Sequence, residues 1–215
     1  MGLRTLVVVA LAAWVGWLLA RGILRRAVPW IGIAVVAVPL VALFWTERQW
    51  VSAEQRFTAI ARSIAPGSAG VHCQRLGEAF TYAGADLGRV AYAEDGSADG
   101  PAMVTYETCQ HLSDYWRSSA AERDVPPLEQ VVAVHVLTHE ARHLAGDRSE
   151  SETECRALQG DADVARRLGA TPRQAQALAV TYAITVYPRM PAAYRTPDCR
   201  PDGPLDLTPH DGVWP

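Results

Sequence analysis

Two histidines and a glutamate in the middle of the chain have the types and the spacing of a catalytic metal site. His139 and His143 are four residues apart, and Glu140 directly follows the first of them. On a helix, residues four apart lie on one face, so both imidazoles can bind one ion at about 2 Å. From its neighbouring position Glu140 can reach a metal-bound water and act as a general base. The spacing therefore predicts a hydrolytic metal centre on a helix.

A third ligand must come from outside this motif, and the next segment is rich in glutamates. We expect a helix over Glu150–Leu168, with Ser149 and Glu152 as its capping box. If this helix runs antiparallel to the motif helix, the residue level with the ion is about five positions in, roughly 7.5 Å along the axis. That residue is Glu154, the expected third ligand. Glu150, one turn earlier, is expected to accept a hydrogen bond from a ligand histidine, although the helix dipole alone also favours acidic residues here.

This ligand set resembles the zincin signature of zinc metallopeptidases, and in particular its gluzincin branch. The segment 149–159 also resembles a group of bacterial membrane-anchored zincin-like proteins, over about residues 71–200 and most specifically over 135–159. The resemblance implies a zincin-like fold, a zinc cofactor and hydrolysis of peptide bonds in a peptide or protein substrate. The sequence departs from the family pattern in the charged Arg142 and in the short interval between the motif and Glu154.

Other functions are compatible with the same residues. A zinc site could stabilise a non-catalytic extracytoplasmic binding module, or it could hydrolyse a non-peptide component of the cell envelope. Glu140 favours an enzyme, because a structural zinc site needs no base and fills its fourth position with protein. His135, one turn before His139, could be a further ligand or could support one, but a lone histidine in an apolar run is more often a hydrogen-bonded core residue, and we expect the latter. Five downstream side chains are available to stabilise an oxyanion, namely Tyr182, Tyr187, Tyr194, Arg195 and His210.

Two apolar runs near the N-terminus predict a membrane anchor. Thr5–Ala20 and Ala27–Trp45 contain no charged residue, and the second is close to the ~20 residues that cross a bilayer. The residues between them include Arg21, Arg25 and Arg26. Arginines in a short loop favour the cytoplasmic side, so we expect two transmembrane segments in the cell membrane and an extracytoplasmic catalytic domain. In the alternative, residues 1–20 are a cleavable signal peptide.

The cysteines agree with an exported domain. All four, Cys73, Cys109, Cys155 and Cys199, follow the apolar runs. An even number of cysteines outside the cytoplasm indicates two disulfides, and short loops favour Cys73–Cys109 with Cys155–Cys199 over the other pairings. A structural zinc site from His72, Cys73, Cys109 and His111 is an alternative, but it lacks the usual ligand spacing.

Length and charge limit the remaining possibilities. A chain of 215 residues has room for an anchor and one domain of about 150 residues. We expect an α+β protein, with a transmembrane helical hairpin at 1–45, a juxtamembrane helix and linker at 46–70, and a small, mostly helical zincin-like domain at 71–215. A β-hairpin is expected over Gly88–Tyr106. The net charge of -3 and the scattered basic residues argue against nucleic acid as a partner.

Overall fold

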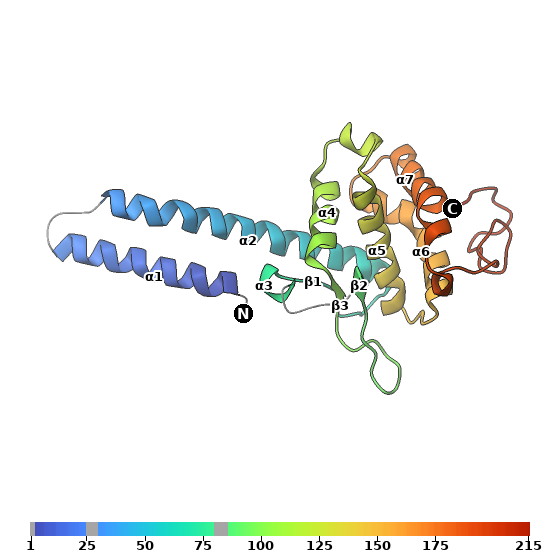
Figure 1. Cartoon of the computed structure of the whole chain (residues 1–215), viewed down its shortest axis with the longest axis horizontal. Coiled ribbons are helices and arrows are strands. Elements are labelled where there is room, and N and C mark those ends of the chain that lie inside the picture. The colour runs from blue at the N-terminus through green and yellow to red at the C-terminus, as the bar shows by residue number, and fades with distance from the viewer. Residues whose placement is uncertain (1–2, 25–29, 80–85) are drawn as a thin grey trace. The chain divides into compact units, whose positions relative to one another are not determined.

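The computed structural model describes residues 3–24, 30–79 and 86–215 (Figure 1). The chain divides into two compact units, Met1–Glu54 and Gln55–Pro215. Helix α1 spans Leu3–Leu24, and α2 spans Trp30–Ile64, so α2 contributes to both units.

The first unit contains a candidate membrane span. Among the described residues, one helix is long and apolar enough to cross a membrane, within Leu6–Ile23 of α1. A membrane anchor and a signal sequence both meet this criterion. The second expected span, Ala27–Trp45, begins at residues that lie outside the described ones, and its part from Trp30 onward is helical. Large apolar side chains such as Trp14 and Phe44 are exposed in α1 and α2. The two-span topology stays a prediction.

The second unit contains a three-stranded mixed sheet. Strand β1 (Val71–Cys73) pairs in parallel with β3 (Ala102–Val104), which pairs antiparallel with β2 (Gly88–Arg89). The order is β1-β3-β2. A bridge between Tyr92 and Ala98 continues the β2–β3 hairpin towards its tip. The hairpin predicted from alternating residues is therefore confirmed, and β1 adds a strand that the sequence pattern did not indicate.

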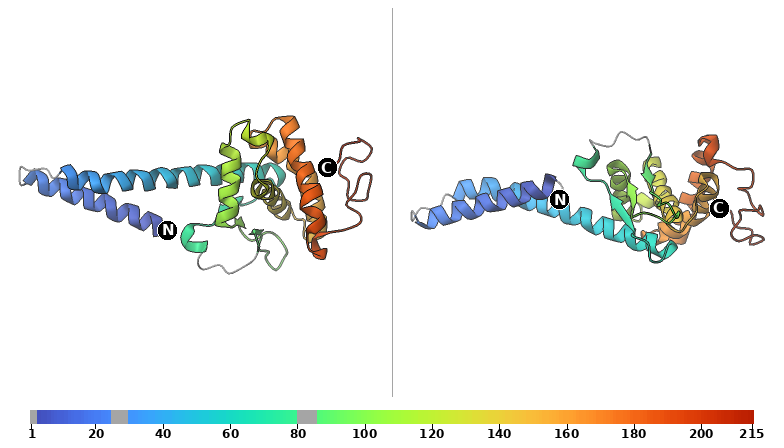
Figure 2. Two further views of the ribbon diagram at one scale, coloured as in Figure 1. Left: turned by 45° about the horizontal axis from the view of Figure 1, so that its top comes forward. Right: turned by 90° about the horizontal axis from the view of Figure 1, so that it is seen from below.

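Helices make up most of the second unit. They are α3 (Leu76–Ala79), α4 (Tyr106–Arg117), α5 (Leu128–Leu144), α6 (Glu150–Arg167) and α7 (Pro172–Thr185), with 3-10 turns at Glu122–Asp124, Tyr187–Arg189 and Ala192–Tyr194. Helix α5 packs against α4, α6 and α7 (Figure 2). Its central position explains why most of its side chains are buried, and these include the residues of the motif.

The boundaries of α5, α6 and α7 have different local causes. Helix α7 begins with a capping box, because the side chain of Thr171 accepts from the backbone N–H of Gln174 and Pro172 occupies the first turn. Gly146 follows α5 with φ +104°, a left-handed conformation that favours glycine. The capping box predicted for α6 is not formed. Ser149 makes no side-chain capping bond, and Glu152 instead pairs with an arginine on the next turn at 3.0 Å.

The end of α2 belongs to the folded domain. Phe57, Ile60 and Ala61 are buried in its core. The hydroxyl of Thr58 bonds to both the N–H and the carbonyl of Val71, at 3.0 and 3.1 Å. These contacts explain why the compact unit begins at Gln55, ahead of the domain start expected at residue 71.

Two disulfides fasten the domain, with the pairing that loop length favoured. Cys73–Cys109 joins β1 to α4, and Cys155–Cys199 joins α6 to the C-terminal segment. The first bond rules out the alternative zinc site, because it uses both of the cysteines that the site would need. The C-terminal segment is also held by Gln159, which bonds to the backbone of residues 205 and 207 at 2.9 and 2.7 Å.

Candidate metal centre

Helix α5 places the two histidines of the motif side by side. Both side chains are buried, because this part of α5 is covered by its neighbouring helices. The Nε2 atoms of His139 and His143 lie 2.9 Å apart. The rings meet edge to face with their centroids 4.6 Å apart. The helical spacing thus produces the juxtaposition that the sequence predicted.

The first turn of α6 brings a carboxylate to the same point. Oε2 of Glu150 lies 3.2 Å from Nε2 of His139 and 3.4 Å from Nε2 of His143. A hydrogen bond with His139 lowers the pKa of Glu150, although burial opposes this. Its side chain is 43% exposed, whereas the histidine side chains are less than 10% exposed. Glu150 therefore lies at the solvent side of the cluster.

The other nitrogen of each ring faces an oxygen atom. Nδ1 of His143 donates to the carbonyl of Asp147 at 2.7 Å, and Tyr92 donates its hydroxyl to the same carbonyl at 3.0 Å. Nδ1 of His139 lies 3.0 Å from Oε2 of Glu154, although the angle of this contact departs from that of a hydrogen bond. Both rings are thereby oriented with Nε2 towards Glu150.

This arrangement fits a cation. If the Nδ1 atoms of His139 and His143 carry the ring protons, two nitrogen lone pairs and a carboxylate converge on one point, which is unfavourable unless positive charge lies between them. Two zinc–nitrogen bonds at a tetrahedral angle separate the nitrogens by about 3.3 Å, close to the 2.9 Å found here. His139, His143 and Glu150 could therefore hold a metal ion.

Glu140 lies buried beside strand β2. A Cβ atom at Gly88 would come within 2.7 Å of Oε1 of Glu140, so the strand approaches the carboxylate closely because residue 88 has no side chain. Among the described residues, Oε2 of Glu140 has no hydrogen-bond partner. Burial raises the pKa of Glu140 to about 7, while His139 opposes the rise and Glu150 adds to it. A carboxylate with such a pKa suits a general base near neutral pH.

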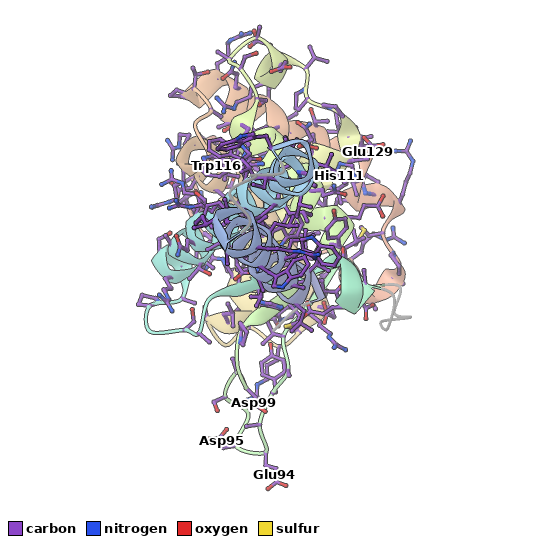
Figure 3. All side chains as sticks on the ribbon, turned by 90° about the vertical axis from the view of Figure 1, so that its left-hand side faces the viewer. Glu94, Asp95, Asp99, His111, Trp116 and Glu129 are labelled. Atoms are coloured by element: carbon purple, nitrogen blue, oxygen red, sulfur yellow. A yellow bond between two sulfur atoms is a disulfide. The ribbon has the colours of Figure 1, made fainter. Side chains whose placement is uncertain are left out.

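The β2–β3 hairpin is fastened to the loop between α5 and α6. The guanidinium of Arg148 lies 5.3 Å from the ring centroid of Tyr92 and also bonds to the carbonyl of Gly96. The tip of the hairpin carries three acidic side chains that project away from the helices, Glu94, Asp95 and Asp99 (Figure 3). The hairpin thus supports the His143 side of the cluster.

His135 lies behind the cluster in the core. Its Nδ1 is 2.8 Å from Oδ2 of Asp161, and its Nε2 is 3.0 Å from Oε2 of Glu154. The expectation of a hydrogen-bonded core histidine is confirmed. His135, His139 and Glu154 also form a second group whose ligand atoms lie close enough to hold an ion.

The oxyanion candidates differ in their positions. The hydroxyl of Tyr182 donates to Oε1 of Glu154 in the core at 2.7 Å, and that of Tyr187 bonds to the backbone of residue 196. Arg195 and His210 are exposed. Tyr194 is the candidate beside the cluster, with its ring centroid 6.0 Å from that of His139. Burial raises the pKa of Tyr194, and Glu150 raises it further.

The two glutamates of α6 both contact the histidines, but at different ring atoms. Glu150 reaches both Nε2 atoms, whereas Glu154 contacts His139 at Nδ1. Glu154 is level with the ion along the backbone, but the Nε2 atoms lie at the far end of the imidazole rings, away from that level. The bond to the Asp147 carbonyl also turns His143 towards the loop from which α6 starts. The first turn of α6 therefore meets the Nε2 atoms of both histidines, and its second turn meets the Nδ1 side of His139.

Three contributors to the site, Tyr92, the Asp147 carbonyl and Asp161, were not indicated by the sequence. No residue spacing in the sequence could place Tyr92 beside the motif, because Tyr92 contacts His143 from a hairpin that is distant in sequence. Asp161 follows Glu154 by seven residues, two helical turns on the same face of α6, and this spacing is the one signal that could have associated it with the site. No family model, no curated protein and no solved structure matches the chain.

Proposed function

We propose that this protein is a membrane-anchored zinc peptidase, with His139, His143 and Glu150 as the metal ligands and Glu140 as the general base. The observation that carries the proposal is the convergence of two Nε2 atoms and one carboxylate oxygen within 3.4 Å of one another. Glu140 belongs to the same helix and has a free carboxylate oxygen among the described residues. A purely structural zinc site has no use for such a group.

The residues divide the work of amide hydrolysis. Zinc at this position would supply a Lewis acid and would acidify a water molecule. Glu140 would take a proton at Oε2 and pass it to the leaving amine. Tyr194, whose ring lies beside that of His139, is our choice for the donor to the developing oxyanion. Glu154 and the Asp147 carbonyl would hold the two imidazoles in position.

The setting of the site favours a peptide as substrate. Strand β2 lies at the edge of the sheet, and its Gly88 borders Glu140. An extended peptide can pair with an edge strand through its backbone, which would bring a peptide bond close to the base. The two disulfides and the apolar α1 helix support a domain outside the cytoplasm. The proposed substrates are therefore proteins or peptides of the cell envelope.

Glu140→Gln in the full-length protein tests this function. The amide nearly preserves the shape of the side chain but removes the base, so zinc content should stay at the wild-type level. Hydrolysis of a broad peptide library should fall at least ~100-fold. Glu129→Gln is the matched control, because Glu129 lies exposed on the same helix (Figure 3).

Two outcomes would count against the proposal. A wild-type protein that binds zinc but cleaves no peptide in the library would favour the non-catalytic module, or a hydrolase with a non-peptide substrate. A Glu140→Gln variant that cleaves at the wild-type rate would exclude Glu140 as the base.

A further inference from the structure

A continuous row of buried polar side chains leads away from the candidate metal centre. Oδ2 of Asp161 lies 2.8 Å from Nδ1 of His135, and Nε2 of His135 lies 3.0 Å from Oε2 of Glu154. The same Oε2 atom lies 3.0 Å from Nδ1 of His139. Asp161, His135 and Glu154 are each at most 2% exposed. Residues of α5 and α6 alternate along this row.

A fifth residue fixes the middle of the row from α7. The hydroxyl of Tyr182 donates to Oε1 of Glu154 at 2.7 Å. Its ring stacks on the His135 ring with centroids 3.6 Å apart and an angle of 12° between the planes. Both oxygens of Glu154 are thus engaged, and His135 is held in its plane as well as at both ring nitrogens. Such a constrained group has few alternative arrangements.

Stability alone does not account for this row. Burying carboxylates and an imidazole has a large desolvation cost, and hydrophobic replacement of buried ionic groups is often neutral or stabilising. Asp161 is fully buried. It pairs with His135, which is also buried and ionisable, so the cost of removing both groups from water is incurred. A role in holding the His139 ring in one orientation, with a negative charge next to its Nδ1 atom, explains the arrangement better.

We infer that Asp161, His135 and Glu154 form a positioning chain that holds the Nδ1 side of His139 and so directs its Nε2 towards the metal. The inference rests on the proposed metal centre. Residues behind a metal-bound histidine orient its ring and strengthen it as a ligand. Here Glu154 contacts the ligand His139, and the row continues through His135 to Asp161. Asp161 would therefore act on the metal without touching the metal or any of its ligands. Tyr182 holds Glu154 in the orientation that reaches His139.

Zinc affinity of Asp161→Asn tests the chain at its far end. The full-length wild type and variant are titrated with zinc against a competing chelator, and the absorption spectrum of bound Co²⁺ is recorded. We expect zinc affinity to fall 10–100-fold and the cobalt spectrum to change. Asp163→Asn is the matched control, because Asp163 lies on the same helix and pairs with surface arginines. It should leave both readouts unchanged.

Two further variants keep the test decisive if Asp161→Asn folds poorly. Tyr182→Phe retains the stacked ring but removes the donor to Glu154, and it should also weaken zinc binding. Replacing His135 and Asp161 together by leucine removes the far end of the row, so zinc affinity should fall whether or not the metal-free protein also loses thermal stability through the unpaired Glu154. A merely structural role predicts a loss of stability with unchanged zinc affinity.

The results separate failure of this inference from failure of the proposed function. If the wild type binds one zinc ion and the variants match it in affinity and spectrum, the positioning chain is wrong and the metal centre stands. If the wild type binds two ions per chain, and Glu154 and His135 are ligands of the second, the chain is a metal site and the inference is overturned. A wild type that binds no zinc would remove the proposed function and the inference together.

Discussion

Oε2 of Glu154 lies 3.0 Å from Nδ1 of His139, at the ring nitrogen that points away from His143. This contact separates the roles of two glutamates that stand one helical turn apart. Glu150 faces the point at which both Nε2 atoms meet, and Glu154 holds one of the rings from behind. In the proposed metal centre, Glu150 is therefore a ligand and Glu154 supports the ligand His139.

Substitution of each glutamate should reveal this difference. Glu150→Gln removes a charged ligand, so we expect zinc to be lost on dialysis against a weak chelator. Glu154→Gln retains all three ligands and should keep zinc with an affinity reduced 10–100-fold. Metal analysis after graded chelator treatment measures both. Retention by Glu150→Gln together with complete loss from Glu154→Gln would restore the assignment that the helix register suggested.

The sequence predicts those parts of the site that depend on local spacing. His139, Glu140 and His143 lie within one and a half turns of a single helix, so their proximity follows from helical geometry. Which glutamate of α6 meets them depends on the loop from Ala145 to Ser149 and on the direction of the rings, and the residue pattern encodes neither. Tyr92 reaches His143 only through tertiary structure.

The same distinction holds for the fold. The ends of α5 and α7 coincide with residues whose local preferences a sequence can show, Gly146 in a left-handed conformation and Thr171 as a helix cap. Strand β1 has three residues and pairs in parallel with a strand that is distant in sequence, so it leaves no periodic signal. The capping box at Ser149 failed because Glu152 is used in an ion pair with Arg156.

Gly88→Ala should impair Glu140 while leaving the metal ligands intact. The added methyl group would lie within 3.0 Å of three atoms of the Glu140 side chain, so the flexible carboxylate would have to move. We expect a large loss of peptide hydrolysis with unchanged zinc content. Gly77→Ala is the control, since a Cβ atom there meets nothing within 4 Å. Full activity of Gly88→Ala would show that the position of Glu140 is not critical.

The Cys155–Cys199 disulfide should matter for activity as well as for stability. It tethers the segment that carries Tyr194 to α6. Replacing both cysteines by serine should lower the free energy of unfolding by about 2–4 kcal/mol and should reduce hydrolysis more than zinc binding. The corresponding replacement of Cys73 and Cys109 is the comparison, because that bond lies between β1 and α4. Equal effects of the two replacements on hydrolysis would argue against a role for Tyr194.

The buried row should make the folded protein less stable at alkaline pH. Burial alone would lower the pKa of His135, but the facing carboxylates of Asp161 and Glu154 outweigh it and raise the pKa to about 10. A raised pKa contributes stability that is fully present below the unfolded value of about 6.5 and is lost as the pH rises through about 10.

Chemical denaturation of the metal-free protein between pH 6.5 and pH 10 measures this effect. The free energy of unfolding should decline over this window in the wild type and decline less in His135→Asn. The chain has 20 arginines and no lysine, so no lysine side chain titrates in this range. Parallel pH profiles for the two proteins would contradict the assignment of the charge to His135.

The most direct test of the metal centre is the position of the ion in a zinc-loaded crystal, measured by anomalous scattering on the two sides of the zinc absorption edge. The proposed centre predicts one peak per chain, bonded to Nε2 of His139, to Nε2 of His143 and to the carboxylate of Glu150. No peak at this position, or a peak bonded instead to Glu154 and His135, would contradict it.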